Sequence, residues 1–411
     1  MRRLGSSVLA SWALAAALAT GAARAEVPAR PIFLMIVVDG LRPDHLGCYG
    51  YPGFTSPTID SLCASGVVFS HAYAQSSWAP ASVASILTSR LPTDHGVRTG
   101  DDALHADAPT LATALEWAGY LTVAYVPDVG ERRGFERGFN DFHTIPNLTA
   151  GTAEFDQASP VERVALPLVV WIEQHPRELQ NDPLLFFVRY NGTQLAHIAS
   201  PDYLRRFAYP PIDPWRLVDI RNRIHGFQLR LPEEEVRDLA PLYDASVAEL
   251  DATLEAMLEP LRKPSIAERL WIILLAPCGE ALGEHGLIGH GSTLYEEQIH
   301  VPLVIVPPRG HPSGFRYDPV VELIDVAPTV LGLAGLPPTP ESKGRNLRPA
   351  LERGFLQKSD AIAELLPPDP LRVHSRAVIA ADLKKRIEKP DGTVERYDLA
   401  VDPGETRALT K

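Results

Sequence analysis

Three groups of side chains along this chain are of types that bind metal ions or act in catalysis. Cys278, His285 and His290 lie close together in sequence among glycines, and a thiolate with two imidazoles is a donor set that suits Zn²⁺. The two histidines equally fit an ordered loop that only lines a pocket. Asp39 follows an apolar run, where its carboxylate either binds a cation or caps the next turn. The hydroxyl of Ser77, just before an expected helix, is of a type that serves as a nucleophile.

Buried strands that alternate with helices are expected to position these side chains. Apolar runs rich in branched residues predict strands at 32–38, 121–126, 184–190, 271–276 and 301–306. Apolar periodicity and capping signals predict helices at 81–89 and 110–118 and a long amphipathic helix from about 243 to 258. This alternation predicts an α/β fold with a large mixed, mainly parallel sheet covered by helices on both faces.

The first 25 residues have the pattern of an export signal. Arg2 and Arg3 precede a short apolar run, and the segment ends in Ala23-Arg24-Ala25, a small-x-small cleavage pattern. The run is shorter than the roughly 20 residues that cross a bilayer, and no later segment predicts an integral membrane helix. Residues 1–25 are therefore expected to be a cleaved signal peptide, and the mature protein to be periplasmic or extracellular.

The remainder of the chain divides into two expected units. Residues 26–336 are expected to form the main α/β domain, in which 195–235, rich in Pro, Arg and Tyr and without a clear period, forms a surface loop or lid. Residues 337–411 are expected to form a small C-terminal α+β subdomain with an antiparallel sheet. Within it, Lys389–Thr393 is a hairpin turn flanked by segments 377–388 and 394–399.

The net charge limits the classes of binding partner, and the number of cysteines limits the disulfide bonds that can form. The formal net charge is −12 over 411 residues, which argues against nucleic acid as the main partner. Cys48, Cys63 and Cys278 are the three cysteines; they allow one disulfide bond with one free thiol in an oxidising compartment but form no disulfide framework, and the sequence leaves their disulfide status open.

Seven stretches, in order along the chain, together resemble the sulfatase family of the alkaline phosphatase superfamily. They are VVDGLRPDHLGCYGY, SPTIDSLCASGVVFSHAYAQSSW, SVASILTSRLPTDHGV, GEALGEHGLIGHGSTLYEE, VPLVIVPP, LIDVAPTVLGLAGLP and YDLAVDPGETRAL. The resemblance implies a large α/β sandwich with its active site at the carboxyl ends of central strands and a small C-terminal sheet. It also implies hydrolysis of sulfate or phosphate esters by a nucleophile at a helix start, assisted by a divalent cation.

The resemblance places the family's nucleophile at Ala79. A methyl group cannot attack an ester, and none of the cysteines lies in the motif that is oxidised to formylglycine in sulfatases. Ser82 matches the serine that follows the nucleophile in that motif. It is therefore assigned a structural role and not that of a substitute nucleophile. Ser77, and after it Ser76, are the neighbouring hydroxyls that would have to substitute.

The metal positions that the resemblance implies are altered in parallel. Asp39 is retained as a metal ligand of the family, but its neighbour, often a second Asp, is Gly40. The expected Asp-His pair after a later strand is Pro277-Cys278, and a soft sulfur donor suits neither Ca²⁺ nor Mg²⁺. His290 matches a basic residue that contacts the sulfate in relatives.

A further family motif with two histidines is also missing, since the corresponding stretch runs from Arg189 to Gln194. We therefore expect an exported, sulfatase-like protein that is catalytically impaired or a pseudoenzyme, without cofactor. It would bind an anionic ligand, sulfated or phosphorylated, or a protein partner. The alternative is an active hydrolase of sulfate or phosphate esters with a non-standard nucleophile such as Ser77, or with Ca²⁺, Mg²⁺ or Zn²⁺ in a non-standard site.

Overall fold

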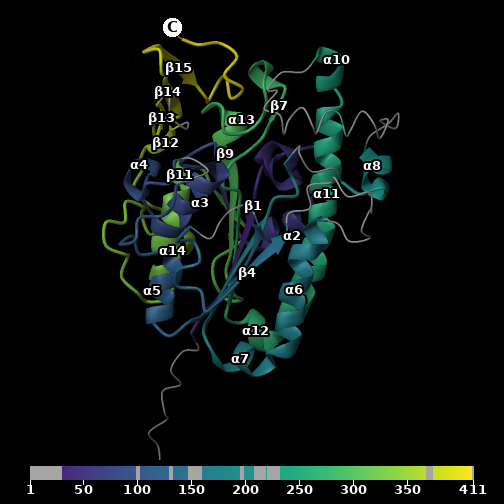
Figure 1. Ribbon diagram of the computed structural model, residues 1–411, viewed down its shortest axis with the longest axis vertical. Helices are drawn as coiled ribbons and strands as arrows, with labels where there is room; N and C mark the ends of the chain where they lie inside the picture. The colour runs from purple at the N-terminus through teal and green to yellow at the C-terminus, as the bar shows by residue number, and fades with distance from the viewer. Residues whose placement is uncertain are drawn as a thin grey trace, which may run out of the picture.

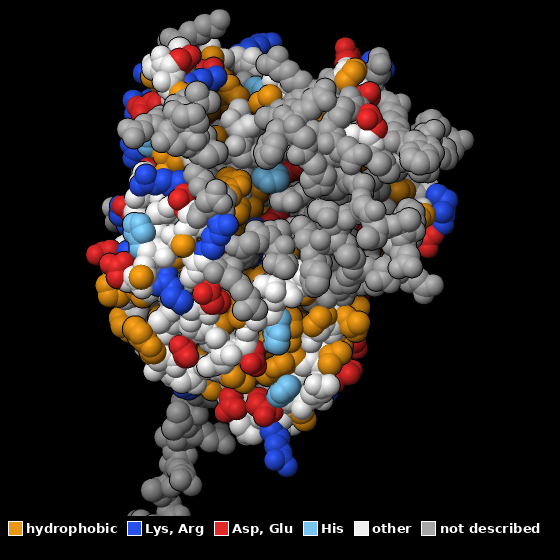
Figure 2. All heavy atoms as spheres, viewed as in Figure 1, with side chains coloured by type: hydrophobic (Ala, Val, Ile, Leu, Met, Phe, Trp, Pro, Cys, Tyr) orange, Lys and Arg blue, Asp and Glu red, His pale blue; other side chains and the backbone are white. Residues whose placement is uncertain are grey.

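The computed structural model describes residues 30–98, 102–128, 133–146, 160–194, 199–207, 219, 232–366 and 374–409. The expected signal peptide at 1–25 and most of the expected loop at 195–235 lie outside these residues. Among the helices of the described part, none has both the length and the apolar character needed to cross a membrane. Figure 2 shows Lys and Arg interspersed with Asp and Glu on the face viewed, over a chain whose net charge is −12.

A nine-stranded sheet runs through the molecule in the order β10-β2-β9-β6-β1-β5-β3-β4, with β11 beside β2. Its strands are β1 (Ile32–Val38), β2 (Val67–Tyr73), β3 (Leu121–Asp128), β4 (Asp141–Pro146), β5 (Leu184–Tyr190), β6 (Leu270–Leu275), β9 (His300–Val306), β10 (Phe315–Tyr317) and β11 (Val321–Glu322). Strand β9 is antiparallel to β2 and β6, and the other pairings of this sheet are parallel. The predicted mixed, mainly parallel sheet is confirmed.

Helices cover both faces of the sheet, as Figure 1 shows. One face carries α2 (Pro57–Ser65), α6 (Pro160–Gln174) and α11 (Leu239–Leu258), and the other carries α3 (Ala79–Thr88), α5 (Leu111–Trp117) and α14 (Val326–Leu333). The shorter helices are α4 (Pro92–His95), α7 (Pro176–Asn181), α8 (Pro201–Phe207), α10 (Glu233–Val236), α12 (Pro264–Ala267), α13 (Glu296–Ile299) and α15 (Arg348–Arg353). Strands connected through helices give this layered arrangement.

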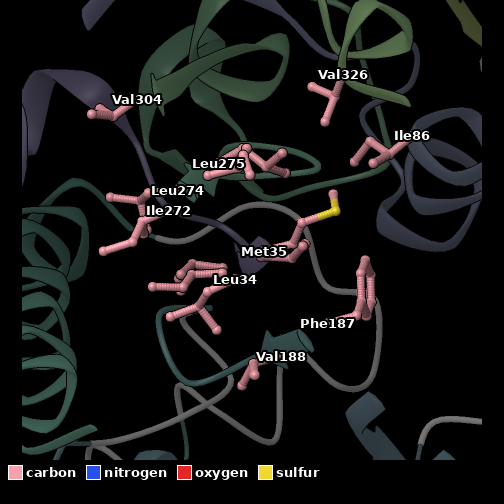
Figure 3. Close-up of a cluster of buried hydrophobic side chains, with 14 of the residues drawn as sticks. Leu34, Met35, Ile86, Phe187, Val188, Ile272, Leu274, Leu275, Val304 and Val326 are labelled. Carbon is pink, nitrogen blue, oxygen red and sulfur yellow. The ribbon is translucent and has the colours of Figure 1, made fainter. Parts of the chain in front are cut away.

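The centre of the core is strand β1, every residue of which is buried. It pairs in parallel with β5 and β6, so that Ile36 lies beside both Val188 and Leu274. Figure 3 shows Met35 on the side of Ile86 from α3 and Val326 from α14. A strand buried on both faces needs apolar side chains at successive positions, which is why IFLMIVV carries no polar alternation.

A four-stranded antiparallel sheet forms the C-terminal part, in the order β12-β13-β14-β15. Its strands are β12 (Ala361–Leu365), β13 (Ser375–Ile379), β14 (Lys384–Glu388) and β15 (Val394–Asp398). The hairpin across 389–393 is present between β14 and β15. Segment 377–388 divides into two strands, because the chain turns at Leu383, whose φ of 65° is left-handed. No glycine or proline marks that turn in the sequence.

Cys48 and Cys63 form a disulfide bond, which settles a pairing that the sequence left open. The bond joins a 3₁₀ turn at Gly47–Tyr49 to helix α2. Cys278 is free and fully buried.

We expect replacement of Leu34 by Ala to lower the free energy of unfolding by about 2–5 kcal/mol, because the cavity left at the centre of β1 cannot collapse. Leu166→Ala is the matched control: that side chain is 62% exposed on α6, so the change should stay within about 0.5 kcal/mol. Urea unfolding followed by circular dichroism measures both. Similar losses in the two variants would contradict the assignment of β1 to the core.

Candidate functional site

The candidate site lies where three adjacent strands end. Asp39 directly follows β1, Arg189 lies near the end of β5, and Cys278 comes shortly after β6. Because these strands are parallel, their carboxyl ends meet at one edge of the sheet, where α/β proteins place their ligand sites. Tertiary structure therefore brings together residues that are far apart in sequence.

The central contact of the site is an ion pair between Asp39 and Arg189. The guanidinium donates Nε–H to Asp39 Oδ1 at 2.8 Å and Nη2–H to Oδ2 at 2.6 Å. Both side chains are almost completely buried, at 3% and 2% exposure. A two-point, charge-assisted contact of this kind occupies both carboxylate oxygens. Asp39 thus has a guanidinium as the partner of its carboxylate in this structure.

A second buried pair joins Glu280 to His290. Glu280 Oε2 lies 2.6 Å from His290 Nδ1, and Gln194 Nε2 lies 3.3 Å from His290 Nε2. Burial lowers the pKa of His290, but the charge and hydrogen bond of Glu280, with the charge of Asp39, raise it above its ordinary value. The imidazole therefore carries a positive charge over a wider pH range than a free histidine.

The Cys278 thiol is a poor metal ligand in this environment. Burial, followed by the charges of Asp39 and Glu280, raises its pKa well above the ordinary value. The thiol is therefore protonated in the absence of a metal ion, and its soft sulfur does not match Ca²⁺ or Mg²⁺. Pro277, its neighbour, has no side-chain donor atom.

His285 lies away from this group. Its ring stacks on Tyr295 with a centroid separation of 3.8 Å, and its Nδ1 lies 3.2 Å from Glu297 Oε1. The structure therefore does not bring together Cys278, His285 and His290. Within the part of the chain that the structure describes, no three His, Cys, Asp or Glu side chains are arranged to hold a metal ion. The residues at the family's metal position do not fit the cation that the family uses.

The start of helix α3 forms the other wall of the site. Ala79 is the first residue of the helix and is 2% exposed, and Trp78 precedes it without a side-chain cap. A Cβ on Gly291, next to His290, would lie 3.5 Å from Trp78 Cδ1. The start of α3 and the His290 loop are therefore neighbours.

Two serine hydroxyl groups near Ala79 in sequence differ in their hydrogen bonding. Ser76 Oγ accepts a hydrogen bond from the Trp78 N–H at 3.3 Å. Ser77 Oγ is fully buried and has no hydrogen-bond partner among the described residues. A buried hydroxyl without a partner is costly, so Ser77 is the more notable of the two. Ser82 Oγ, inside α3, shares this condition.

Sequence reasoning missed the functional weight of Arg189 and Glu280. In the sequence analysis, Arg189 was named only as the first residue of the stretch to Gln194, which lacks the two histidines of the family motif. A signal was present, because an arginine within the apolar run LLFFVRY must find a buried acidic partner. Asp39, at the end of a neighbouring strand, was available for that role, but strand order cannot be read from the sequence.

Comparison with known proteins identifies the family. Residues 31–336 match the Sulfatase family. The uncharacterized sulfatase YidJ of Escherichia coli K12 is 23% identical over 77% of this chain and 70% of its own length. Human arylsulfatase A is 28% identical over 82% of this chain and 70% of its own length. Delta 4,5-hexuronate-2-O-sulfatase of Bacteroides thetaiotaomicron is 23% identical over 96% of this chain and 87% of its own length.

Solved structures show the same fold. BT4656, in complex with its substrate D-glucosamine-2-N,6-O-disulfate, superposes with a TM-score of 0.77 at 18% identity, over 92% of this chain and 93% of that one. The phosphonate monoester hydrolase of Agrobacterium radiobacter also gives a TM-score of 0.77, at 20% identity, over 92% and 91%. The match to the family over three-quarters of the sequence, together with this architecture, means that the chain belongs to the sulfatase family.

Proposed function

We propose that this chain is an exported sulfatase-family protein that binds an anionic ligand, sulfated or phosphorylated, at the degenerate active site without hydrolysing it. The observation that carries the proposal is the buried ion pair between Asp39 and Arg189. It supports a site in which a side-chain cation has taken the place of the metal ion, next to a nucleophile position that holds Ala79.

The loss of the metal follows from ligand count and charge. A hard divalent cation needs about six oxygen ligands at fixed distances. Both oxygens of Asp39 are held by Arg189, and a metal ion would have to displace a buried guanidinium to reach them. Pro277 has no side-chain donor, and the soft sulfur of Cys278 does not suit a hard cation.

The loss of turnover follows from the helix start. Ester hydrolysis in this family needs a reactive atom at the first turn of α3, where backbone N–H groups favour the anion. The Cβ of Ala79 is inert. A hydroxyl placed even about 1 Å from the productive position loses most of its effect, so neighbouring serines are poor substitutes.

What remains supports binding of an anion. The pKa of His290 is raised, which favours its positively charged form. The start of α3 adds backbone N–H groups and the positive end of the helix dipole. The charges of Asp39 and Arg189 offset each other, so the site lacks the excess positive charge of a metal centre. Glu280 likewise offsets the charge of His290, so binding depends on the N–H groups of His290 and of the start of α3 as hydrogen-bond donors. The sulfated sugar bound by BT4656 is consistent with a ligand of this class.

The alternative function is an active hydrolase that uses Ser77 as nucleophile. One observation favours it, namely that Ser77 Oγ is buried without a partner next to the start of α3. Ser77 lacks a base in contact with it among the described residues, which is what a serine nucleophile needs. The pseudoenzyme is therefore the better supported function.

We expect metal binding to return only when Arg189 is removed. The triple variant Arg189→Gln/Pro277→Asp/Cys278→His frees Asp39 and supplies an Asp-His pair, so Ca²⁺ should bind stoichiometrically in calorimetry. At a hundredfold excess over the Kd, it should stabilise the fold by about 2.7 kcal/mol. The double variant Pro277→Asp/Cys278→His, with Arg189 intact, is the control and should not bind. Equal Ca²⁺ binding by wild type would overturn the proposed loss of the metal.

We expect anion binding to weaken as pH rises. His290 is charged below its raised pKa and becomes neutral as pH passes through that pKa, so the affinity for inorganic sulfate and 4-nitrophenyl sulfate should fall about tenfold from acid to alkaline solution. His290→Gln should bind weakly at every pH. His311→Gln, which changes an exposed histidine, should behave as wild type. A pH-independent affinity in wild type would exclude His290 as the binding cation.

We expect no turnover of 4-nitrophenyl sulfate or 4-nitrophenyl phosphate above the buffer rate, because Ala79 cannot attack. Release of 4-nitrophenol measures this directly. Hydrolysis that disappears in Ser77→Ala, but persists in Ser65→Ala on the surface of α2, would establish the alternative function.

A further inference from the structure

A short hairpin carries His290 into the site and His285 away from it. Strands β7 (Ala281–Leu282) and β8 (Ile288–Gly289) pair with each other, and His290 follows β8 directly. The tip between the strands is a tight turn that contains His285. The two histidines therefore lie at opposite ends of one short hairpin, so contacts that fix the tip also constrain the position of His290.

The tip is held by contacts outside the hairpin. His285 has a φ of 54°, a left-handed conformation that costs a residue with a Cβ on the order of 1 kcal/mol. Such a conformation persists when surrounding contacts determine it. Those contacts are the stacked ring of Tyr295 and hydrogen bonds to both ring nitrogens.

Both partners of the His285 ring nitrogens are acceptors. Nδ1 lies 3.2 Å from the Glu297 carboxylate, and Nε2 lies 3.3 Å from the backbone carbonyl oxygen of Glu405. A neutral imidazole has only one N–H, so it satisfies one of these acceptors and not the other. The arrangement is complete only for the imidazolium, which donates from both nitrogens.

Glu405 belongs to the last described turn of the chain, and its carboxylate is also fixed. Oε2 accepts the N–H of Glu296 at 2.6 Å, at the start of α13, and Oε1 lies 2.9 Å from Nζ of the fully buried Lys385 on β14. Lys385 also pairs with Glu296 at 2.9 Å. Figure 1 shows the yellow C-terminal segment beside β7 and α13. The C-terminal sheet, α13 and the hairpin tip thus meet at one point.

We propose that the C-terminal segment is a latch on the candidate site: the Glu405 carbonyl, together with Glu297 of α13, holds the two ring nitrogens of His285 and fixes the β7–β8 hairpin, which positions His290. His285 is a positioning residue in this scheme, since it acts on the site through the hairpin. The proposal deepens the proposed function, on which it rests for the role of His290 in binding.

Protonation of His285 sets the state of the latch. The hydrogen bond and charge of Glu297 raise its pKa against the effect of burial, and Glu405 adds to this. Since the pKa in the folded protein is above the unfolded value, the stabilisation is fully present below the unfolded pKa, about 6.5. It is lost as pH rises through the folded pKa. The latch is therefore closed in acid and loosens in alkali.

The other charged groups at this junction shape the same response. Burial raises the pKa of Glu405 to about 7, although Lys385 opposes this. Glu296 and the hydroxyl of Tyr73 face the same cluster. In acid, protonation of the Glu405 carboxylate removes its charge and weakens its ion pair with Lys385. The backbone carbonyl of Glu405 does not titrate and still accepts the hydrogen bond from His285. The His285 contact therefore outlasts the change at the Glu405 carboxylate.

Hydrogen–deuterium exchange of the whole protein tests the latch without any ligand. In His285→Gln, amides of residues 402–409 and of 281–291 should exchange roughly tenfold faster, because a charge-assisted contact is lost. In wild type, both segments should gain the same exposure as pH rises, after correction for intrinsic exchange. His143→Gln is the matched control, since His143 also stacks on a tyrosine, Tyr125, but on the far edge of the sheet.

Two further readouts separate a positioning role from a merely structural one. Glu297→Gln keeps an acceptor but removes its charge, so it should move the pH of loosening to lower values without abolishing the transition. In His285→Gln, the NMR titration of His290 should shift towards that of an ordinary histidine, because its alignment with Glu280 is lost. Faster exchange in 402–409 alone, with hairpin exchange and the His290 titration unchanged, would overturn the latch. Absence of sulfate binding with an intact latch would contradict only the proposed function.

Discussion

The ion pair between Asp39 and Arg189 is the interaction on which the character of this site depends. Two opposite charges buried at the ends of adjacent strands are stable only together, because either alone in the interior costs about 3–5 kcal/mol. The pair therefore commits the chain to a site without a free carboxylate. In the proposed function, His290 is then the group that distinguishes anions from neutral ligands.

Under the proposed function, the ion pair links the residues that the sequence carries at several family positions. With Arg189 holding Asp39, the Asp-His pair expected after β6 would add a carboxylate with no cation to bind. Pro277 and Cys278 create no such charge. Burial keeps the Cys278 thiol neutral, which limits the negative charge around Asp39 and Glu280. Under the proposed function, replacement of the metal ion by a guanidinium would account for the altered ligands as one electrostatic change.

The surrounding fold has been kept because its stability comes from elsewhere. Strand β1 and its neighbours bury apolar side chains on both faces, and that burial is indifferent to the chemistry at the strand ends. The C-terminal sheet contributes in another way, since Lys385, Glu405 and His285 tie it to the hairpin that presents His290. The proposed loss of catalysis is therefore compatible with retention of the fold.

The sequence by itself determined the family architecture, because apolar runs such as 32–38 and 184–190 specify buried strands through local composition. It also determined that residue 79 carries no reactive atom. Only the tertiary structure decided the partners. Asp39 and Arg189 are 150 positions apart, and nothing local indicates that β1 and β5 are neighbours. The same holds for His285, which lies close to Cys278 and His290 in sequence yet contacts Glu405, because the hairpin turns its tip away from the strand ends.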